Sequence, residues 1–295
     1  QWQGKTYGLP IYSDIEAFYY NTDLYQKAGF DPTKPPTTWQ ELAEMSSKLA
    51  IRQGGQLVQE GFAVPQDAAE DLSNMWYCLL LQAGGSFLTE DSKSAAFNDE
   101  AGQQALQFMV DLIHKYKVTE VGYGQGLNGA ATPFYAAKSA SEYQDSTEFY
   151  YFGKYAPKLT YTVAMLPAGP KGQAAASQAF VMFIPKASKN QDNAWKFIDF
   201  AMKPDQQIAF NKTSSHLPCE TDALKSDPFF SQSKNLKPFY DELVNFSQPF
   251  PIAPSYPDIL ANLQQEFQAA VLGKEDVKTA VNNAATYANQ QLGKS

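Results

Sequence analysis

Two pairs of carboxylates stand close together in the sequence and could do chemistry. Asp14 and Glu16 are separated by one residue, and Glu142 and Asp145 by two. A glycosidase hydrolyses its substrate with such a pair, in which one group acts as the acid and the other as base or nucleophile. Because the sequence does not give the distance between the carboxyl groups, glycoside hydrolysis stays open as one hypothesis.

The other motifs that could bind a cofactor or a metal are weak. His114 lies in a segment with helical spacing and is interpreted as structural. His216, in the turn SSHLPCETDAL, could contact a ligand, although a structural role is favoured for it too. GQGLNG, residues 124–129, satisfies the dinucleotide pattern, but Thr132 and Pro133 follow where that motif needs a helix. We therefore expect no cofactor and no metal.

Aromatic residues make up 14% of the chain. Tyrosine and tryptophan combine an apolar face, which can stack on the C–H groups of a sugar ring, with a polar edge that can form hydrogen bonds. Any single one of them is most simply a core residue, but as a set they favour a carbohydrate cleft. The set comprises Tyr12, Phe18, Tyr19, Tyr20, Trp76, Tyr77, Tyr143, Phe149, Tyr150, Tyr151 and Tyr256.

The charge balance excludes several partners. The chain has 31 acidic and 23 basic residues and a net charge of −8, which argues against nucleic acid or an anionic membrane as partner. Arg52 is the sole arginine. Arginine is the residue that clamps phosphate with two parallel hydrogen bonds, so a ligand with a dianionic group has little here to meet it.

Two features concern the cellular compartment. No apolar run is long enough to span a bilayer, and QWQGKTYG at the start contains neither an initiator methionine nor a signal sequence. We interpret the sequence as a processed or truncated product. Cys78 and Cys219 could be two free thiols or one disulfide; a free, buried thiol is favoured for Cys78 because Trp76, Leu79 and Leu80 surround it in the sequence.

Helices and strands alternate along the sequence, which predicts an α/β fold. Residues 188–202 are predicted to form a helix that begins with a capping box at Ser188 and turns Trp195 inward. Residues 158–167 and 178–185 are short, rich in β-formers and ended by proline, so we expect strands there.

The stretch GKTYGLPIYSDIEAFYYNTDLYQKAGFDPTKPPTTWQELAEMSSKLA resembles a segment of the extracellular solute-binding proteins of ABC importers, the family that contains maltose- and glycerol-3-phosphate-binding proteins. FYAAKSA, VAMLPAGPKG, SKNQDNAWKFIDFAMKPDQQIAFNKTSSHLP and GKEDVKTAVNNAATYANQQL resemble later segments of the same family, so the likeness runs the whole length. The chain departs from the family pattern at Ala137, where the family has glycine, and at Ser177-Gln178, where it has two glycines.

The resemblance implies a periplasmic-binding-protein-like fold of type II, with two lobes of which the first is incomplete. Residues 1–166 and 218–295 would form the second lobe, and residues 167–217 the returning part of the first. The family places a β/α half-lobe ahead of this point. Without it, the first lobe would have an incomplete sheet and exposed apolar surface.

The resemblance also implies a ligand site at the turn after Pro10. Carboxylates there would accept hydrogen bonds from vicinal hydroxyls, and aromatic side chains would stack on the ligand or cap it. The ligand-binding residues expected in this way are Tyr12, Ser13, Asp14, Glu16, Trp76, Tyr143, Asp145, Gln178, His216 and Tyr256.

By resemblance, the protein is the substrate-binding component of an ABC importer. It would capture a neutral sugar or glycoside by hinge closure and deliver it to the membrane permease, without breaking a bond. We expect a monomer in the periplasm or outside the cell, held by a lipid anchor through the missing N-terminal part. One alternative ligand is glycerol 3-phosphate or a glycerophosphodiester, which the near absence of arginine opposes. The alternative from another class is the glycoside hydrolase.

Overall fold

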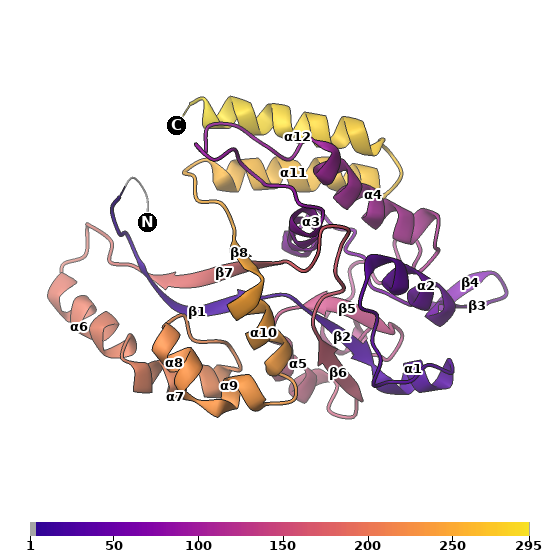
Figure 1. The fold of residues 1–295 in the computed structure, drawn as a ribbon, viewed down its shortest axis with the longest axis horizontal. Helices are drawn as coiled ribbons and strands as arrows, with labels where there is room; N and C mark the ends of the chain where they lie inside the picture. Colours follow the sequence, from indigo (N-terminus) through magenta and orange to yellow (C-terminus); the bar gives the residue numbers. More distant parts are fainter. Residues whose placement is uncertain (1–3, 295) are drawn as a thin grey trace.

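Figure 1 shows the computed structural model, which describes residues 4–294, as two groups of elements joined by extended segments. Gln1 to Gln3 and Ser295, which open and close the expected second lobe, lie outside the described residues. Helices and strands alternate along the chain, so the expected α/β class is confirmed.

One sheet joins distant parts of the chain. β1 (Leu9–Ile15) pairs antiparallel with β7 (Ala175–Met182), and β7 pairs parallel with β8 (Ser247–Pro249). A second sheet has the order β5 (Ser141–Gln144), β2 (Ala17–Asn21), β6 (Tyr161–Ala164), with both pairs antiparallel. β1 ends one residue before β2 begins, so the chain passes directly from one sheet into the other at Glu16.

Helices cover the sheets in separate layers. In Figure 1, α3, α4, α11 and α12 form a stack at the top, while α6 to α9 lie beside β1 and β7 at the lower left. The hairpin of β3 (Ile51–Gln53) and β4 (Gln56–Gln59) projects at the right edge. The helices are α1 (Thr22–Lys27), α2 (Trp39–Leu49), α3 (Glu70–Gln82), α4 (Glu100–His114), α5 (Glu148–Tyr155), α6 (Gln191–Ala201), α7 (Pro204–Ser214), α8 (Thr221–Ser226), α9 (Pro228–Gln232), α10 (Lys237–Asn245), α11 (Tyr256–Val271), α12 (Val277–Leu292) and the 3-10 helix η1 (Gly129–Ala131).

The sequence YYNTD explains how the chain turns from β2 into α1. Tyr19 and Tyr20 are buried on opposite faces of β2, as the two-residue period of a strand requires. Asn21 then caps α1, because its side-chain oxygen accepts a hydrogen bond from the Leu24 amide at 3.0 Å. Tyr25 is buried one turn later. The stretch thus fixes the end of a central strand and the start of the helix that follows.

Two cysteines are present, and both are free thiols; Cys78 is buried, as expected, and Cys219 is half-buried.

Two details of the helix predicted over residues 188–202 were wrong. α6 begins at Gln191 with Asn190 as its N-cap, which makes no side-chain capping bond, so the capping box at Ser188 does not form. Trp195 is 54% exposed rather than turned inward.

Trp195 is one of several large apolar side chains that are exposed in this part of the molecule. Side chains from β7, the segment after it, α6 and α7 are exposed together: Phe180, Val181, Phe183, Trp195, Phe197, Phe200 and Phe210. Ile198 is the sole buried residue of α6. Phe180 and Val181 are adjacent in β7 and point to opposite sides of the sheet, and Phe180 stacks on Tyr12 with ring centroids 4.6 Å apart. Helices normally bury their apolar stripe against another element. The exposed rings of α6, Trp195, Phe197 and Phe200, here called the apolar face, lack such a packing partner.

Strand pairing bears on the expected lobe boundaries. β1 belongs to the segment assigned to the second lobe, yet it pairs with β7, which was assigned to the first. The separate sheet β5-β2-β6 takes its first strand in chain order, β2, directly after this crossing. The division of the chain into lobes is taken up below as a proposal, with β1 grouped with β7.

Candidate functional site

The side chains of β1 alternate between two surroundings. Tyr12 and Asp14 both face His216: the ring centroids of Tyr12 and His216 are 4.0 Å apart, and Asp14 Oδ1 lies 3.6 Å from His216 Nε2. Ser13 points the other way, where its Oγ lies 3.0 Å from Cys219 Sγ. The structure therefore brings Tyr12, Asp14 and His216 together and leaves Ser13 out.

Asp14 is buried without a hydrogen bond to its Oδ1 atom, and the residue is 4% exposed. Burial, followed by the charges of Asp145 and Glu70, raises the pKa of Asp14 to about 8. Burial also lowers the pKa of His216. At pH 7 the carboxyl group of Asp14 is therefore mostly protonated and the imidazole neutral, so their contact is not an ion pair.

Glu16 occupies the crossing between the two sheets. Its Oε1 accepts a hydrogen bond from Asn74 Nδ2 at 3.3 Å, on the first turns of α3. Burial raises its pKa well above the ordinary value, and Asp145 and Asp71 add to the shift. Glu16 thus faces the same group of carboxylates as Asp14.

Asp145 follows β5 and is held by its neighbours. Its carbonyl oxygen accepts a hydrogen bond from the Tyr19 hydroxyl at 2.9 Å, and its Oδ1 accepts one from the Thr147 amide at 2.6 Å. The Thr147 hydroxyl in turn lies 3.2 Å from His216 Nε2. These contacts connect the end of β5 to the residues of β1.

Gln178 completes the group from β7. It pairs with Asp14 across β1 and β7, and its Nε2 donates a hydrogen bond to Glu70 Oε1 at 3.2 Å. Paired residues in adjacent strands project to the same face of a sheet, so Glu70 lies over that face. The carboxylates gathered here are called the acidic cluster: Asp14, Glu16, Glu70, Asp71 and Asp145.

Two of the expected aromatic residues are core residues instead. Trp76 is 0% exposed, and its indole Nε1 donates a hydrogen bond to the Gly102 carbonyl at 3.3 Å. Tyr143 packs edge-on against Phe18 and Phe62. The Trp76 ring has no free face for a ligand, and Tyr143 is 7% exposed with its ring packed on two neighbours, so neither residue is carried into the proposed site.

Tyr256 stands at the start of α11, at the edge of the acidic cluster. Its ring packs against Phe87 and Phe250, with centroid distances of 5.7 and 6.4 Å. Its hydroxyl is buried and makes no hydrogen bond. Burial raises its pKa, with contributions from Tyr77 and Glu70. Tyr256 therefore stays a candidate at the rim.

Four residues next to the expected site were not found from the sequence: Glu70, Asp71, Asn74 and Thr147. In the sequence, Glu70 and Asp71 are the acidic first turn of a helix, a pattern that any exposed helix start shows. The N-cap Ala69 makes no side-chain capping bond, but α5, α6, α7, α10 and α11 also lack one, so the sequence gives no signal that separates Glu70 and Asp71 from an ordinary helix start.

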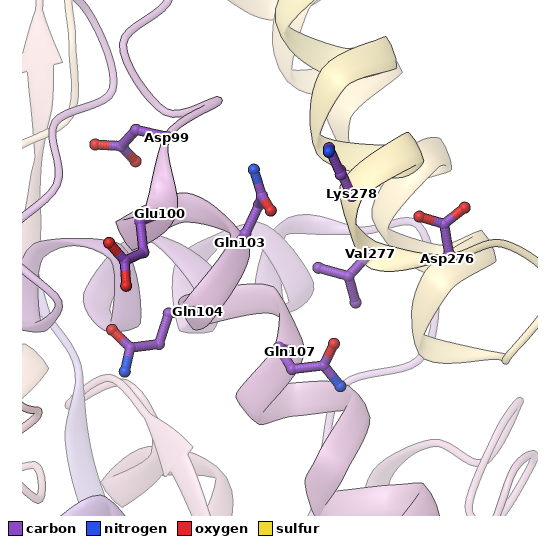
Figure 2. Close-up of a pocket in the computed structure, with 8 residues that line it drawn as sticks. All are labelled: Asp99, Glu100, Gln103, Gln104, Gln107, Asp276, Val277 and Lys278. Carbon is purple, nitrogen blue, oxygen red and sulfur yellow. The ribbon is translucent and has the colours of Figure 1, made fainter.

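Hollows elsewhere on the surface are less suited to a ligand. Figure 2 shows a depression of about 610 Å³ between the starts of α4 and α12, where Gln103 and Gln107 face Val277. Its carboxylates Asp99 and Asp276 each accept a backbone hydrogen bond at 3.0 Å as helix N-caps. Because their function is to cap helices, the depression does not need a ligand to satisfy them.

A smaller hollow of about 180 Å³ adjoins the acidic cluster through Asp71 and is also bordered by Glu60, Gln144 and Gly124.

Among the described residues, His, Cys, Asp and Glu side chains nowhere gather in a group of three or more that could hold a metal ion. None of the described helices combines the length and the hydropathy needed to cross a membrane.

Two sheets joined where the chain passes from β1 to β2 and from β6 to β7, with polar side chains collected at the first of these crossings, are the architecture of a two-lobe solute-binding protein. The sequence profile of the bacterial extracellular solute-binding proteins matches residues 1–208, and the chain belongs to this family. Among curated relatives, the sn-glycerol-3-phosphate-binding periplasmic protein UgpB of Shigella flexneri is 23% identical over 305 residues, which are 98% of this chain and 68% of UgpB.

Solved structures agree with this assignment. A solute-binding protein of Thermotoga lettingae, bound with α-D-tagatose, superposes with a TM-score of 0.86 at 26% identity, covering 99% of this chain and 74% of that one. Maltose-bound MalE3 of T. maritima has a TM-score of 0.80 at 28% identity, covering 97% and 73%. The expected type II two-lobe fold is thereby confirmed.

Proposed function

We propose that this chain captures a sugar or glycoside between its lobes and delivers it to an ABC permease. The observation that carries the proposal is the acidic cluster beside Tyr12, with Asp14 Oδ1 buried and lacking a hydrogen bond. Sugar hydroxyls would donate to these carboxyl groups, and hinge closure would exclude water from them. Both similar structures named above contain a sugar, which supports this ligand class.

The experiment is a thermal-shift screen with neutral mono- and disaccharides, tagatose and maltose among them. A ligand that binds the folded state alone raises the melting temperature in a concentration-dependent way. Calorimetry then gives the dissociation constant of each hit. If no sugar shifts the melting temperature at millimolar concentration, the proposed function is wrong.

Glycerol 3-phosphate is the second candidate, favoured by the similarity to UgpB. A phosphate group requires cationic partners, and Arg52 is not among the residues of the site. Its Nε lies 3.2 Å from Glu120 Oε1, and its Nη2 donates a hydrogen bond to the Lys117 carbonyl. The acidic cluster also offers a dianion no ion-pair partner, because none of the ion pairs among residues 4–294 brings a lysine or arginine to it, so the sugar is the better proposal.

We further propose that no bond is broken at this site. A glycosidase separates the pKa values of its two carboxyl groups so that one is an acid and the other a base. Burial and neighbouring carboxylates raise the pKa of Asp14 and of Glu16 in the same direction. Incubation with oligosaccharides tests this: we expect binding without product, and steady turnover would establish the hydrolase instead.

Glu16→Gln is expected to weaken sugar binding by about 1–3 kcal/mol, the cost of losing a charge-assisted hydrogen bond. The amide keeps the shape of the side chain and one acceptor oxygen toward Asn74, so stability should change little or rise. Calorimetry with a sugar from the screen, together with denaturation curves of both proteins, measures the two effects. Unchanged affinity would remove Glu16 from the site.

We also propose the lobe division, with β1 and residues 167–217 in the first lobe and the remainder mainly in the second. The apolar face supports this proposal, because it is the surface that a further β/α half-lobe would cover. Contact with such a segment would bury Phe197 and Trp195, which are exposed on α6.

The apolar face should bind an environment-sensitive hydrophobic dye when the 295-residue chain is tested alone. Phe197→Lys is expected to reduce the dye fluorescence severalfold, because it places a charge in the middle of that surface. The melting temperature should be unchanged, since exposed substitutions usually alter stability by less than about 0.5 kcal/mol. Tyr150→Lys, an exposed aromatic on α5, is the matched control and should leave the fluorescence as it was. Equal fluorescence of the Phe197 variant and the parent protein would contradict the proposal.

A further inference from the structure

The acidic cluster gathers carboxyl groups from three parts of the chain: Asp14 and Glu16, Glu70 and Asp71, and Asp145. The charged groups that raise the pKa of Glu16 are all carboxylates: Asp145, Asp71 and Asp14. Those acting on Asp14 are Asp145 and Glu70. Among the ion pairs of residues 4–294, none joins a lysine or arginine to a member of the cluster.

Asp14 is directed into this cluster. Gln178, its cross-strand partner, reaches Glu70 on the same face of the sheet. The residue is 4% exposed, and its Oδ1 has no hydrogen bond. A buried carboxyl oxygen without a partner is costly, and native proteins rarely keep one unless something else satisfies it.

The groups around Asp14 do not supply that partner. His216, the basic residue within reach, has its pKa lowered by burial and is neutral at pH 7. A divalent metal would need three or more suitably placed ligands, and no such group exists among the described residues. A ligand group that donates hydrogen bonds and also carries positive charge would satisfy the oxygen, favour release of the Asp14 proton on binding and offset the repulsion between the carboxylates.

We propose that the acidic cluster selects an amino sugar, a sugar carrying an ammonium group, over the same sugar with a hydroxyl or acetamido group in its place. The inference rests on the proposed function and specifies its ligand class. An ammonium group has three hydrogen-bond donors and a compact charge. The acceptor oxygens come from Asp14 on β1, Glu16 at the crossing from β1 to β2, and Asp145 directly after β5.

Calorimetry on the 295-residue protein with matched sugars tests the inference. The probes are glucose, galactose and mannose, each with its 2-amino-2-deoxy and its N-acetylated counterpart, at pH 6.5 and millimolar concentration. In at least one series, the amino sugar should bind about tenfold or more tightly than both counterparts, as a charge-assisted contact predicts. Added salt should reduce this ratio, because it screens the attraction.

Asp145→Asn provides the charge-specific variant. The asparagine keeps the oxygen that accepts from the Thr147 amide, so the fold should be retained and is checked by melting temperature. Affinity for the amino sugar should fall about tenfold further than affinity for a neutral sugar, because the amide keeps hydrogen-bonding atoms but not the charge. Glu44→Gln, on the exposed side of α2, is the control and should alter neither affinity.

The outcomes separate the proposed function, which is sugar binding, from the further inference, which is the preference for an amino sugar. If a neutral or N-acetylated sugar binds as tightly as its amino counterpart in every series, or if Asp145→Asn weakens both classes equally, the inference is wrong and the proposed function stands. If an amino sugar is preferred and Asp145→Asn removes the preference, the inference is supported. If no sugar binds in these series or in the thermal-shift screen, both claims are overturned.

Discussion

Trp76→Ala is expected to lower the free energy of unfolding by about 3–5 kcal/mol, the usual cost of removing a large aromatic side chain from a packed core. The indole is 0% exposed. It packs against Phe87, Phe97 and Phe267, with ring centroids 6.1, 5.4 and 4.6 Å away, and it joins α3 to α11. The substitution therefore leaves a cavity between Phe87, Phe97 and Phe267 that these side chains cannot easily fill.

Urea denaturation measures this loss, and calorimetry with a sugar ligand measures the affinity of the variant. If Trp76 is a core residue, stability falls and the dissociation constant at a temperature where the variant is folded stays the same. The matched control is Trp195→Ala, because Trp195 is 54% exposed on α6. We expect it to change stability by less than about 0.5 kcal/mol. A loss of affinity with unchanged stability in the Trp76 variant would return this residue to the ligand site.

The contrast between the two tryptophans shows what a sequence can and cannot predict. Both lie on helices, but the apolar periodicity of residues 188–202 predicted Trp195 to turn inward, whereas Trp76 was expected at the ligand. Periodicity identifies the apolar side of a helix but not what covers it. Trp76 has α4 and α11 beside it, whereas the described chain provides no element to cover Trp195. Secondary structure was therefore predictable, and burial was not.

The site shows the same limit. Tyr12, Asp14 and Glu16 could be predicted together because strand alternation and the family resemblance both concern local sequence. Glu70 and Asp71 could not, because they reach the cluster only through the packing of α3 against β7. The same alternation excludes Ser13 from the site. Ser13 is the neighbour of Asp14 on β1, so its side chain points to the other face of the sheet.

Asp14→Asn is expected to stabilise the protein without ligand at pH 8 while weakening sugar binding. The ordinary pKa of the side chain is 3.8, and burial together with Asp145 and Glu70 raises it to about 8 in the folded state. The folded state thus holds a proton that the unfolded state releases. The stability from this group is fully present below pH 3.8 and is lost as the pH rises through about 8.

The neutral asparagine removes this loss, because it stays uncharged at every pH. The gain at pH 8 should be about 2–4 kcal/mol, less than the full pKa shift implies, since the protein relaxes around a buried charge. At pH 4 the two proteins should differ little. Urea denaturation at pH 4, 6 and 8 gives the free energy of unfolding of each protein as a function of pH. This free energy should fall less steeply with rising pH in the asparagine variant.

Asp31→Asn is the control for this experiment. Asp31 is exposed, and hydrogen bonds from Thr33 lower its pKa, so its contribution has the opposite sign: it is present above the ordinary pKa and is lost as the pH falls. Its substitution should not stabilise the protein at pH 8.

Calorimetry completes the test of Asp14, because Asp14→Asn should also weaken sugar binding tenfold or more, about 1.4 kcal/mol. A variant that is less stable than the parent at pH 8, or equally stable with unchanged affinity, would show that Asp14 is an ordinary structural carboxylate.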